Sequence, residues 1–184
     1  MASKTKTIFY TKFRHAMYDF DYFEDRPEIA IAVSGGSDSM ALLLLAQKWA
    51  LSHSGKVIAL SVDHRLRKES YSELVQVGRW LKKINVAHHI LTWRKKKISQ
   101  NEARRARYKL LEEWCEQNSV LHVLLGHTQD DQAETIIMRH NKSSHAFGLA
   151  GMSSIKEASH CRFLRPLLTF NKRELQNFLE ANNQ

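Results

Sequence analysis

The stretch Ser34-Gly35-Gly36-Ser37-Asp38-Ser39 decides the expected fold, because it lies between two apolar segments. Residues 29–33 before it are typical of a short buried strand, and residues 40–50 after it are typical of a helix. A glycine turn that joins a strand to a helix lets backbone N–H groups approach an anion, and the helix directs its positive end to the same point. We therefore expect a phosphate-binding loop at 34–39.

This loop differs from the phosphate loop of kinases and GTPases. That loop requires G-x-x-x-x-G-K-[ST], in which the lysine reaches the terminal phosphates. The segment 34–39 has neither that spacing nor a lysine, and it offers three hydroxyls and one carboxylate instead. The alternative is a serine- and glycine-rich turn without a ligand, but the preceding strand and the following helix favour a phosphate loop of another kind.

The rest of the chain alternates between strand and helix patterns. Further strands are predicted at 57–62, 86–93 and 120–126, with a short fifth strand at 161–164 that Pro166 ends. Helices are predicted at 9–22, 39–52, 70–84, 100–118, 130–141 and 172–182. This order indicates an α/β, Rossmann-like fold with a mainly parallel sheet and helices on both faces, in which ligands bind at the carboxyl ends of the strands.

Composition limits the function classes. The chain has 184 residues, which suits a single domain, and 28 Lys and Arg against 19 Asp and Glu give a net charge of +9, which favours a polyanionic partner. The two cysteines, Cys115 and Cys161, have no zinc-site spacing, so we expect a reducing cytosol, no structural metal and a buried Cys115. Because neither a secretory leader nor a long apolar run is found, we expect no contact with a membrane.

The segment Gly126 to Thr135 carries the second group of candidate residues. Thr128 and Asp131 have capping-box spacing, and acidic residues are favoured in the first turn of a helix, which explains Asp131 on structural grounds alone. Asp130 and Glu134 share a helix face, and His127 lies beside them at the end of a strand. Since Mg²⁺ prefers oxygen ligands, we favour a role beside phosphates and metal over capping alone.

Two further groups follow from position. Val62, Asp63 and His64 end the second predicted strand, where many nucleotide-binding folds contact the ribose or the base, so we expect a nucleoside contact there. Arg104 and Arg107 are neighbours on one side of a predicted helix. They supply the positive charge that the lysine-free loop lacks and would bind ATP phosphate or RNA backbone. The alternative for the two arginines is an exposed basic face without a ligand.

Six motifs in this order resemble the tRNA(Ile)-lysidine synthetases, which belong to the PP-loop, or N-type ATP pyrophosphatase, superfamily. They are S-G-G-S-D-S, V-D-H-x-L-R at 62–67, A-R-x-x-R-Y at 103–108, H-T-x-D-D-Q-x-E-T at 127–135, G-L-x-G-M at 148–152 and R-P-L-L at 165–168. The resemblance covers about residues 29–180. It implies that ATP adenylates the C2 carbonyl oxygen of the wobble cytidine of tRNA(Ile) with the anticodon CAU, and that the amine of free L-lysine then displaces AMP.

The resemblance implies roles for the candidate residues. The loop from Ser34, Gly35 and Gly36 to Ser37, Asp38 and Ser39 would hold ATP, with Asp38 and Asp131 near Mg²⁺. His127, Asp130, Asp131 and Glu134 are candidates for holding metal, cytosine or lysine, and the sequence does not divide these roles among them. With Asp38, Arg104 and Arg107 they form the expected catalytic set of a cytoplasmic ligase. The oligomeric state stays open, a homodimer being one alternative.

Two departures from the family pattern concern the end of the chain and one loop. Residues 139–147 lack two glycines of an R-G-S-G-like stretch, which puts the contribution of that loop in doubt. The chain also ends at Gln184, whereas family members usually continue into carboxyl-terminal domains that bind tRNA. We therefore expect residues 1–184 to be a single PP-loop domain, either a catalytic fragment or a form with reduced tRNA recognition.

Three other functions compete with this one. A tRNA-thiolating PP-loop enzyme would use cysteines, and the missing C-x-x-C argues against it. Amidating relatives such as NAD or GMP synthetases need no such cysteines, but the basic composition and the segment 127–135 suit them less well. A module that binds ATP or tRNA without turnover is the third alternative, and lysine-dependent AMP release would distinguish it from an enzyme.

Overall fold

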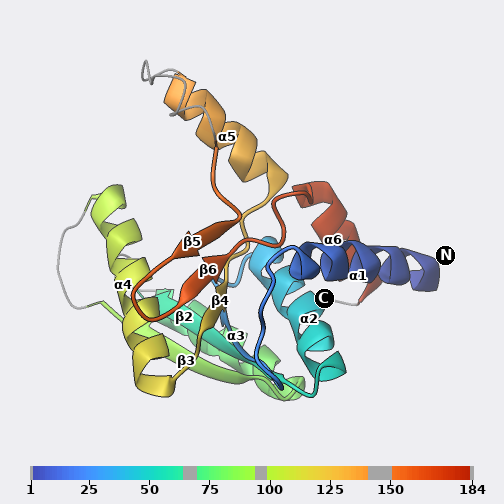
Figure 1. Ribbon diagram of the computed structural model, residues 1–184, viewed down its shortest axis with the longest axis horizontal. Coiled ribbons are helices and arrows are strands. Elements are labelled where there is room, and N and C mark those ends of the chain that lie inside the picture. Colours follow the sequence, from blue (N-terminus) through green and yellow to red (C-terminus); the bar gives the residue numbers. More distant parts are fainter. Residues whose placement is uncertain (1, 64–69, 94–98, 141–150, 183–184) are drawn as a thin grey trace.

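The computed structural model describes residues 2–63, 70–93, 99–140 and 151–182, in which one sheet is covered by helices on both faces (Figure 1). The helices are α1 (Ala2–Tyr18), α2 (Ser37–Ser52), α3 (Ser70–Lys83), α4 (Gln100–Asn118), α5 (Gln129–His140) and α6 (Lys172–Ala181). The strands are β1 (Glu28–Ala32), β2 (Lys56–Asp63), β3 (Ala87–Thr92), β4 (His122–Leu124), β5 (Ile155–Glu157) and β6 (Arg162–Leu164).

The sheet has the order β3-β2-β1-β4-β6-β5, and every neighbouring pair is parallel except β5 with β6. The central strand β1 pairs with β2 on one side and with β4 on the other, so the chain reverses its direction of travel across the sheet at β1. Ligands of open α/β sheets bind at such a switch point, outside the carboxyl ends of the strands. The expected α/β fold with a mainly parallel sheet is confirmed.

Each face of the sheet has its own apolar core. Ile29 and Ile31 of β1 point to the face that α1, α2, α3 and α6 cover, whereas Ala30 points to the face that α4 covers. This alternation follows from the period of two along a strand. The central strands β1 and β2 are buried on both faces and are largely apolar, which is why they could be recognised in the sequence, whereas no residue of β3 is buried.

Two elements differ from the sequence-based expectation. Helix α1 spans residues 2–18 instead of 9–22, and after it the backbone of Asp21 and Tyr22 adopts positive φ. Arg162 of β6 donates hydrogen bonds to the carbonyl oxygens of Phe20, Asp21 and Tyr22, and these contacts hold the chain in the turn. The short antiparallel strand β5 was not predicted, because only three partly exposed residues form it.

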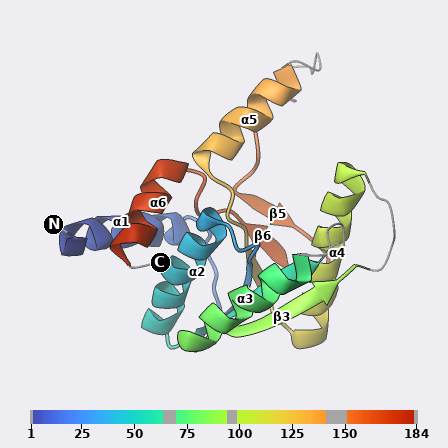
Figure 2. The ribbon, with the colours of Figure 1, turned by 180° about the vertical axis from the view of Figure 1, so that it is seen from behind.

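Helix α5 projects away from the body of the molecule in both views (Figures 1 and 2). None of its residues is buried, whereas the other long helices contribute side chains to a core. Its base lies beside the start of α6, where the Lys172 N–H donates to Asp130, and near its other end Arg139 donates to the Gly151 carbonyl. Within the described ranges, no helix is both long enough and apolar enough to cross a membrane.

Candidate active site

A pocket of about 320 Å³ opens at the carboxyl ends of β1, β2 and β4. Its walls come from the loop after β1, from the end of β2, from helix α4 and from the loop after β4. The lining residues are Ala32, Val33, Ser34, Gly36, Ser37, Asp38, Ser39, Leu60, Val62, Arg104, Arg107, Tyr108, Leu111, Leu125, Gly126 and His127. The segments that follow β1 and β4 and the end of β2 thus meet at one edge of the sheet.

The loop 34–39 turns sharply at Gly35, whose φ of +86° is a conformation that side chains rarely adopt. Hydroxyl groups then fix the loop: the Ser39 Oγ accepts from the Ser34 N–H at 3.2 Å and donates to the Gly36 carbonyl at 2.9 Å. Gly36 has an ordinary extended conformation, so only the first of the two glycines is required for the turn.

Helix α2 begins after Gly36 without a side-chain cap. The first N–H groups of a helix have no partner within the helix, and a side chain, water or a ligand has to satisfy them. Since Gly36, Ser37, Asp38 and Ser39 line the pocket, the start of α2 has the chemistry of an anion site there.

Gly126, after β4, allows a close approach between two backbone segments. A Cβ atom at this position would lie 3.3 Å from both the N and the Cα of Ser39. Real Cβ atoms seldom come so close to backbone, so a side chain at 126 would push against the phosphate loop. Gly126 therefore sets the distance between the loop 34–39 and the segment that carries His127.

Helix α4 provides a basic wall that Arg165 extends. Arg104 and Arg107 line the pocket, and burial lowers the pKa of Arg107. Tyr108 of the same helix accepts a hydrogen bond at 3.1 Å from the guanidinium of Arg165, which also donates to the Ser153 carbonyl at 2.6 Å. Arg165 is only 5% exposed, so its charge acts inside the protein rather than in solvent. Arg104 and Arg107 are both exposed to solvent and both line the pocket, so the alternative of an exposed basic face without a ligand stays open for them.

His127 is uncharged at neutral pH. Burial lowers the pKa of its imidazole to about 4, and the nearby charges of Arg165 and Arg104 act in the same direction. Its buried Nδ1 has no hydrogen-bond partner among the described residues. A buried polar atom without a partner is uncommon in folded proteins and is satisfied when a ligand or water binds. His127 thus offers a neutral ring to the pocket, able to donate or accept a hydrogen bond.

We expect the imidazole of His127 to titrate near pH 4 in the folded protein, against about 6.5 in the unfolded chain. Because the unfolded chain then binds a proton that the folded protein does not, folding stability should fall as the pH is lowered from 6.5 to 4. An NMR titration of the histidine ring signals measures the pKa of His127 in the folded protein, and urea unfolding at several pH values measures the pH dependence of stability. His127→Gln should weaken this part of the pH dependence, and an unshifted ring in the wild-type protein would contradict the expectation.

Carboxylates gather where α5 begins, and Lys172 joins them. The carboxylate of Asp131 accepts hydrogen bonds from the N–H and the hydroxyl of Thr128, and the Asp131 N–H lies 3.4 Å from that hydroxyl, as the capping box predicts. The ammonium of Lys172 lies 3.1 Å from Asp131 Oδ1 and 3.8 Å from Glu134 Oε1. The backbone N–H of Lys172 donates to Asp130 Oδ2 at 2.8 Å. These three carboxylates and Lys172 are called the carboxylate cluster below.

The carboxylate cluster acts on the phosphate loop through its charge. Burial raises the pKa of Asp38, and the negative charges of Asp130 and Asp131 raise it further, while the Ser37 hydroxyl and Lys172 oppose them. Burial would also raise the pKa of Asp131, but the hydrogen bonds from Thr128 and Lys172 outweigh it and lower that pKa. The site thus contains two kinds of charge. The positive charges of Arg104, Arg107 and Arg165 act on His127, and the negative charges of Asp130 and Asp131 act on Asp38.

The structure brings most of the predicted residues to one place. The loop residues, Val62, Arg104, Arg107 and His127 lie at the pocket, and Asp130, Asp131 and Glu134 form the adjoining cluster. Asp63 is 2% exposed at the end of β2 and does not line the pocket. His64 lies outside the described residues. Sequence reasoning missed the roles of Tyr108, Arg165 and Lys172, although the motifs A-R-x-x-R-Y and R-P-L-L contain the first two.

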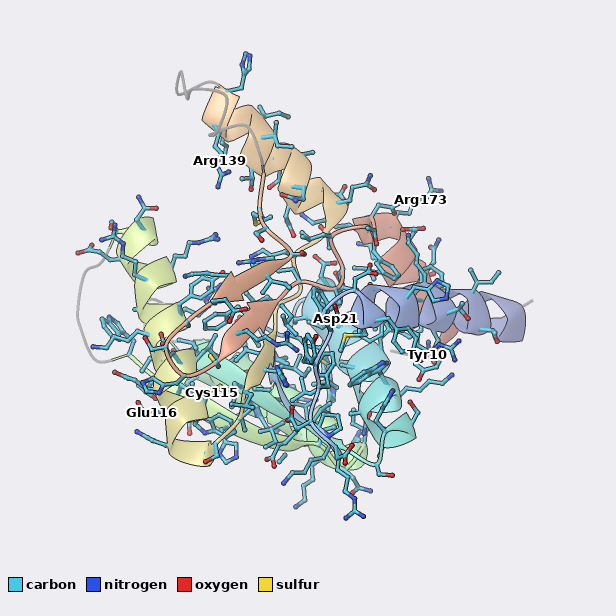
Figure 3. The ribbon with its side chains drawn as sticks, viewed as in Figure 1. Tyr10, Asp21, Cys115, Glu116, Arg139 and Arg173 are labelled. Atoms are coloured by element: carbon cyan, nitrogen blue, oxygen red, sulfur yellow. The ribbon has the colours of Figure 1, made fainter. Side chains whose placement is uncertain are left out.

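The two cysteines lie away from this site. Cys115 on α4 (Figure 3) and Cys161 before β6 are both buried in the core between α4 and the sheet. The expected burial of Cys115 is confirmed. Neither thiol lines the pocket, and among the described residues no group of three or more His, Cys, Asp or Glu side chains is placed to hold a metal ion.

A glycine turn at the amino end of a helix, placed at the switch point of a parallel sheet, defines a nucleotide-binding α/β domain. The family comparison makes this specific, since the model of the PP-loop domain matches residues 5–184. The chain belongs to the PP-loop domain family.

The curated relatives with similar sequences are tRNA(Ile)-lysidine synthases. The chain is 40% identical over 176 residues to a tRNA(Ile)-lysidine synthase of Orientia tsutsugamushi, an alignment that covers 93% of this chain and 39% of the relative. It is 39% identical over 161 residues to a tRNA(Ile)-lysidine synthase of a Bradyrhizobium species, covering 85% of this chain and 45% of the relative. The chain therefore spans less than half the length of these relatives.

Solved structures support the fold. The U34-tRNA thiolase NcsA of Methanococcus maripaludis, solved with its [4Fe-4S] cluster, matches 98% of this chain and 64% of its own with a TM-score of 0.80 and 17% identity. The NH3-dependent NAD synthetase of Campylobacter jejuni matches all of this chain and 74% of its own with a TM-score of 0.62 and 15% identity. At these identities the likeness concerns the fold alone.

Proposed function

We propose that this chain is the catalytic domain of a tRNA(Ile)-lysidine synthase, which joins L-lysine to C2 of the wobble cytidine of a CAU-anticodon tRNA(Ile) at the expense of ATP. The observation that carries the proposal is the division of the site. Anion-binding backbone and arginines suit a triphosphate and RNA, and beside them the carboxylate cluster holds a primary ammonium, that of Lys172. The similarity to curated synthases over most of the chain supports it.

In the first step the cytidine C2 oxygen attacks the α-phosphorus of ATP, and the bond to pyrophosphate breaks. Negative charge develops on the leaving pyrophosphate, and preorganised N–H groups in a partly closed site stabilise such charge effectively. The start of α2 and the hydroxyls of Ser34, Ser37 and Ser39 are the donors for the β- and γ-phosphates. Val62 at the end of β2 contacts the nucleoside, and Arg104 and Arg107 bind phosphate or the RNA backbone.

In the second step the lysine amine attacks C2, AMP leaves with the oxygen that it activated, and the amine loses a proton. The amine must be neutral when it attacks, so the site needs an acceptor for that proton. Asp130, Asp131 and Glu134 hold the amine before attack and accept its proton, whereas the neutral His127 binds the cytosine. A protonated His127 would be disfavoured there by the charges of Arg165 and Arg104.

Asp38 fits a Mg²⁺ ion that is shared with phosphates. Mg²⁺ usually takes one or two carboxylates and completes its shell with water and phosphate oxygens, so a protein-only cage is not required. Asp131 fits less well, because one of its oxygens caps α5 and the other faces Lys172. When bound, Mg²⁺ neutralises charge on the phosphates. We therefore assign the ion to Asp38, with Asp131 as a ligand only where Lys172 has moved.

The substrate also fits the charge of the chain. A net charge of +9 favours association with a polyanion such as tRNA and makes that association sensitive to salt. Since ATP, lysine and tRNA occur together in the cytoplasm, we place the reaction there. Because the chain spans less than half of its curated relatives, we propose that further domains contribute to tRNA binding in the whole protein.

The test is AMP release from α-³²P-labelled ATP with the CAU-anticodon tRNA, in the presence and absence of L-lysine. We expect AMP only when lysine and tRNA are both present, and nuclease digestion of the tRNA should yield a lysine-bearing cytidine. The matched control is the same tRNA with uridine at the wobble position, which should give no product. AMP release with ammonia but not with lysine would favour the amidating alternative, and ATP retention without turnover would favour a binding module.

The thiolation alternative has less support at the site. The tRNA thiolase resembles this chain in fold, but a likeness at 17% identity says nothing about a shared reaction. Cys115 and Cys161 are buried on the far side of α4 from solvent and do not line the pocket. Neither cysteine thiol is therefore available beside the phosphate loop.

A further inference from the structure

Lys172 occupies the part of the site that the proposed function assigns to an amine. Its side chain is a primary ammonium on a four-carbon stem, which is also the reactive end of free lysine. The ammonium lies between Asp131 Oδ1 at 3.1 Å and Glu134 Oε1 at 3.8 Å, and its charge reaches Asp38. In this structure the carboxylates of Asp131 and Glu134 therefore bind the ammonium of a lysine that belongs to the chain itself.

The contact is built by the fold. The Lys172 backbone N–H is fixed by Asp130, and Asn171 caps α6 by accepting from the Glu174 N–H at 2.8 Å, so the root of the Lys172 side chain is anchored beside α5. Its ammonium end is not anchored in the same way, because the side chain is 40% exposed and Glu134 is 68% exposed. The backbone can keep its place while the ammonium swings away into solvent.

We propose that Lys172 is an internal placeholder for the substrate amine: it fills the Asp131 and Glu134 site in the free protein and is displaced when a primary alkylammonium binds. The inference rests on the proposed function for the identity of the substrate, but not for the chemistry of the site. In the free state Lys172 neutralises the carboxylates beside Asp38. Its departure on binding leaves the total charge of the cluster unchanged, so one ammonium is exchanged for another.

Exchange predicts competition of a modest size. A partly exposed ion pair of this kind contributes at most about 1 kcal/mol, which corresponds to a factor of about five. Removing the ammonium while keeping a stem of similar length should thus tighten binding of an external ammonium by about five-fold. Lys172→Met is that change. Lys172→Arg keeps the charge and should keep the competition.

Arg173 provides the matched control. It is the next residue of α6, is exposed, and points away from the helix into solvent (Figure 3). Arg173→Met removes the same charge from the same helix turn without touching the carboxylate cluster. If the effect of Lys172→Met came from net charge alone, Arg173→Met would reproduce it.

The experiment measures binding of n-butylammonium by NMR titration to the wild-type protein and the three variants, at one ionic strength and without Mg²⁺. The KM for lysine in AMP release is measured in parallel. We expect about five-fold tighter butylammonium binding and a lower lysine KM for Lys172→Met alone. Unchanged or weaker butylammonium binding in Lys172→Met, or an equal gain in Arg173→Met, would overturn the inference.

The two readouts separate this inference from the proposed function. If no variant releases AMP in response to lysine, the proposed function fails, and the butylammonium titration still decides whether Lys172 is a placeholder. If lysine drives AMP release but Lys172→Met shows the wild-type KM and the wild-type butylammonium affinity, the function stands and the placeholder fails. Saturation by Mg²⁺ alone, with the same preference for Lys172→Met and no response to butylammonium, would assign the site to a metal ion and also overturn the inference.

Discussion

Asp38→Asn should lower the rate of lysine-dependent AMP release to about 1% of the wild-type rate or less, while the protein folds normally. The substitution keeps the shape of the side chain and its contact with the Ser37 hydroxyl, and removes only the negative charge. If Asp38 holds Mg²⁺ against the phosphates, that charge stabilises the transition state, and losing one such interaction typically costs about 100-fold or more in rate. Single-turnover measurement of AMP formation tests this.

The same change should leave stability unharmed or improve it. Burial and the charges of Asp130 and Asp131 raise the pKa of Asp38 in the folded protein, which means that its ionised form disfavours folding. This cost is fully present above the folded pKa and disappears as the pH falls below the unfolded value of 3.8. The thermal midpoint of Asp38→Asn should therefore equal or exceed that of the wild type at pH 7, and the difference should shrink toward pH 4.

Asp19→Asn is the matched control, because Asp19 is exposed in the turn after α1 and removal of its charge should change neither AMP release nor the thermal midpoint by much. A fall of both activity and stability in Asp38→Asn would contradict the assignment, since it would make Asp38 a structural residue. Wild-type activity would contradict it equally. Functional sites that keep a destabilising charge are a known source of opposite effects on activity and stability.

The fold could be predicted because its central strands β1, β2 and β4 are buried on both faces. The segment 57–62 is apolar except for Ser61, and polar residues follow it where the sheet ends, so its type and its place in the order could be predicted. The same reasoning failed where a distant contact fixes the structure. The turn at Asp21 and Tyr22 depends on Arg162, about 140 residues away in the chain. No local pattern in residues 9–22 records that contact.

The candidate site was predictable to a similar degree. The loop 34–39 and His127 follow strands that meet at β1, so their meeting follows from the parallel sheet. Lys172 lies 42 residues after Asp130 and reaches the carboxylate cluster only because α6 begins beside α5. In the sequence it is one lysine among many, at the basic start of a predicted helix. Its pairing is a property of tertiary packing, which periodicity and motifs do not contain.

Gly126→Val should lower lysine-dependent AMP release by about 100-fold, and Gly126→Ala by about 10-fold. A Cβ atom at 126 would lie 3.3 Å from the Ser39 N and Cα and 3.4 Å from the Asp38 carbonyl carbon. These are backbone atoms of the phosphate loop, which cannot turn aside as the end of a flexible side chain can. The loop must move by a few tenths of an ångström, and a misplacement near 1 Å can cost about 100-fold in rate.

Gly36→Ala gives the informative comparison, because Gly36 belongs to the motif and Gly126 was not singled out as a glycine. At 36 the backbone has an ordinary extended conformation, and the nearest atom to an added Cβ is the Ser34 Oγ at 3.5 Å, an ordinary contact. The Gly36→Ala protein without ligand should therefore keep the wild-type free energy of unfolding to within about 0.5 kcal/mol, as an unstrained substitution does. Gly126→Val should lose about 1–3 kcal/mol, the usual cost of overpacking.

The Gly36 and Gly126 variants should all be measured by urea unfolding and by ATP binding. Urea unfolding reports the stability of each variant, and ATP binding reports the placement of the phosphate loop. If Gly126 sets the spacing between β4 and the phosphate loop, Gly126→Ala weakens ATP binding by a larger factor than its small loss of stability explains. If ATP affinity follows stability alone, the spacing does not matter to the ligand. The loop 34–39 would then hold its shape through the Ser34 and Ser39 hydrogen bonds without support from the strand beside it.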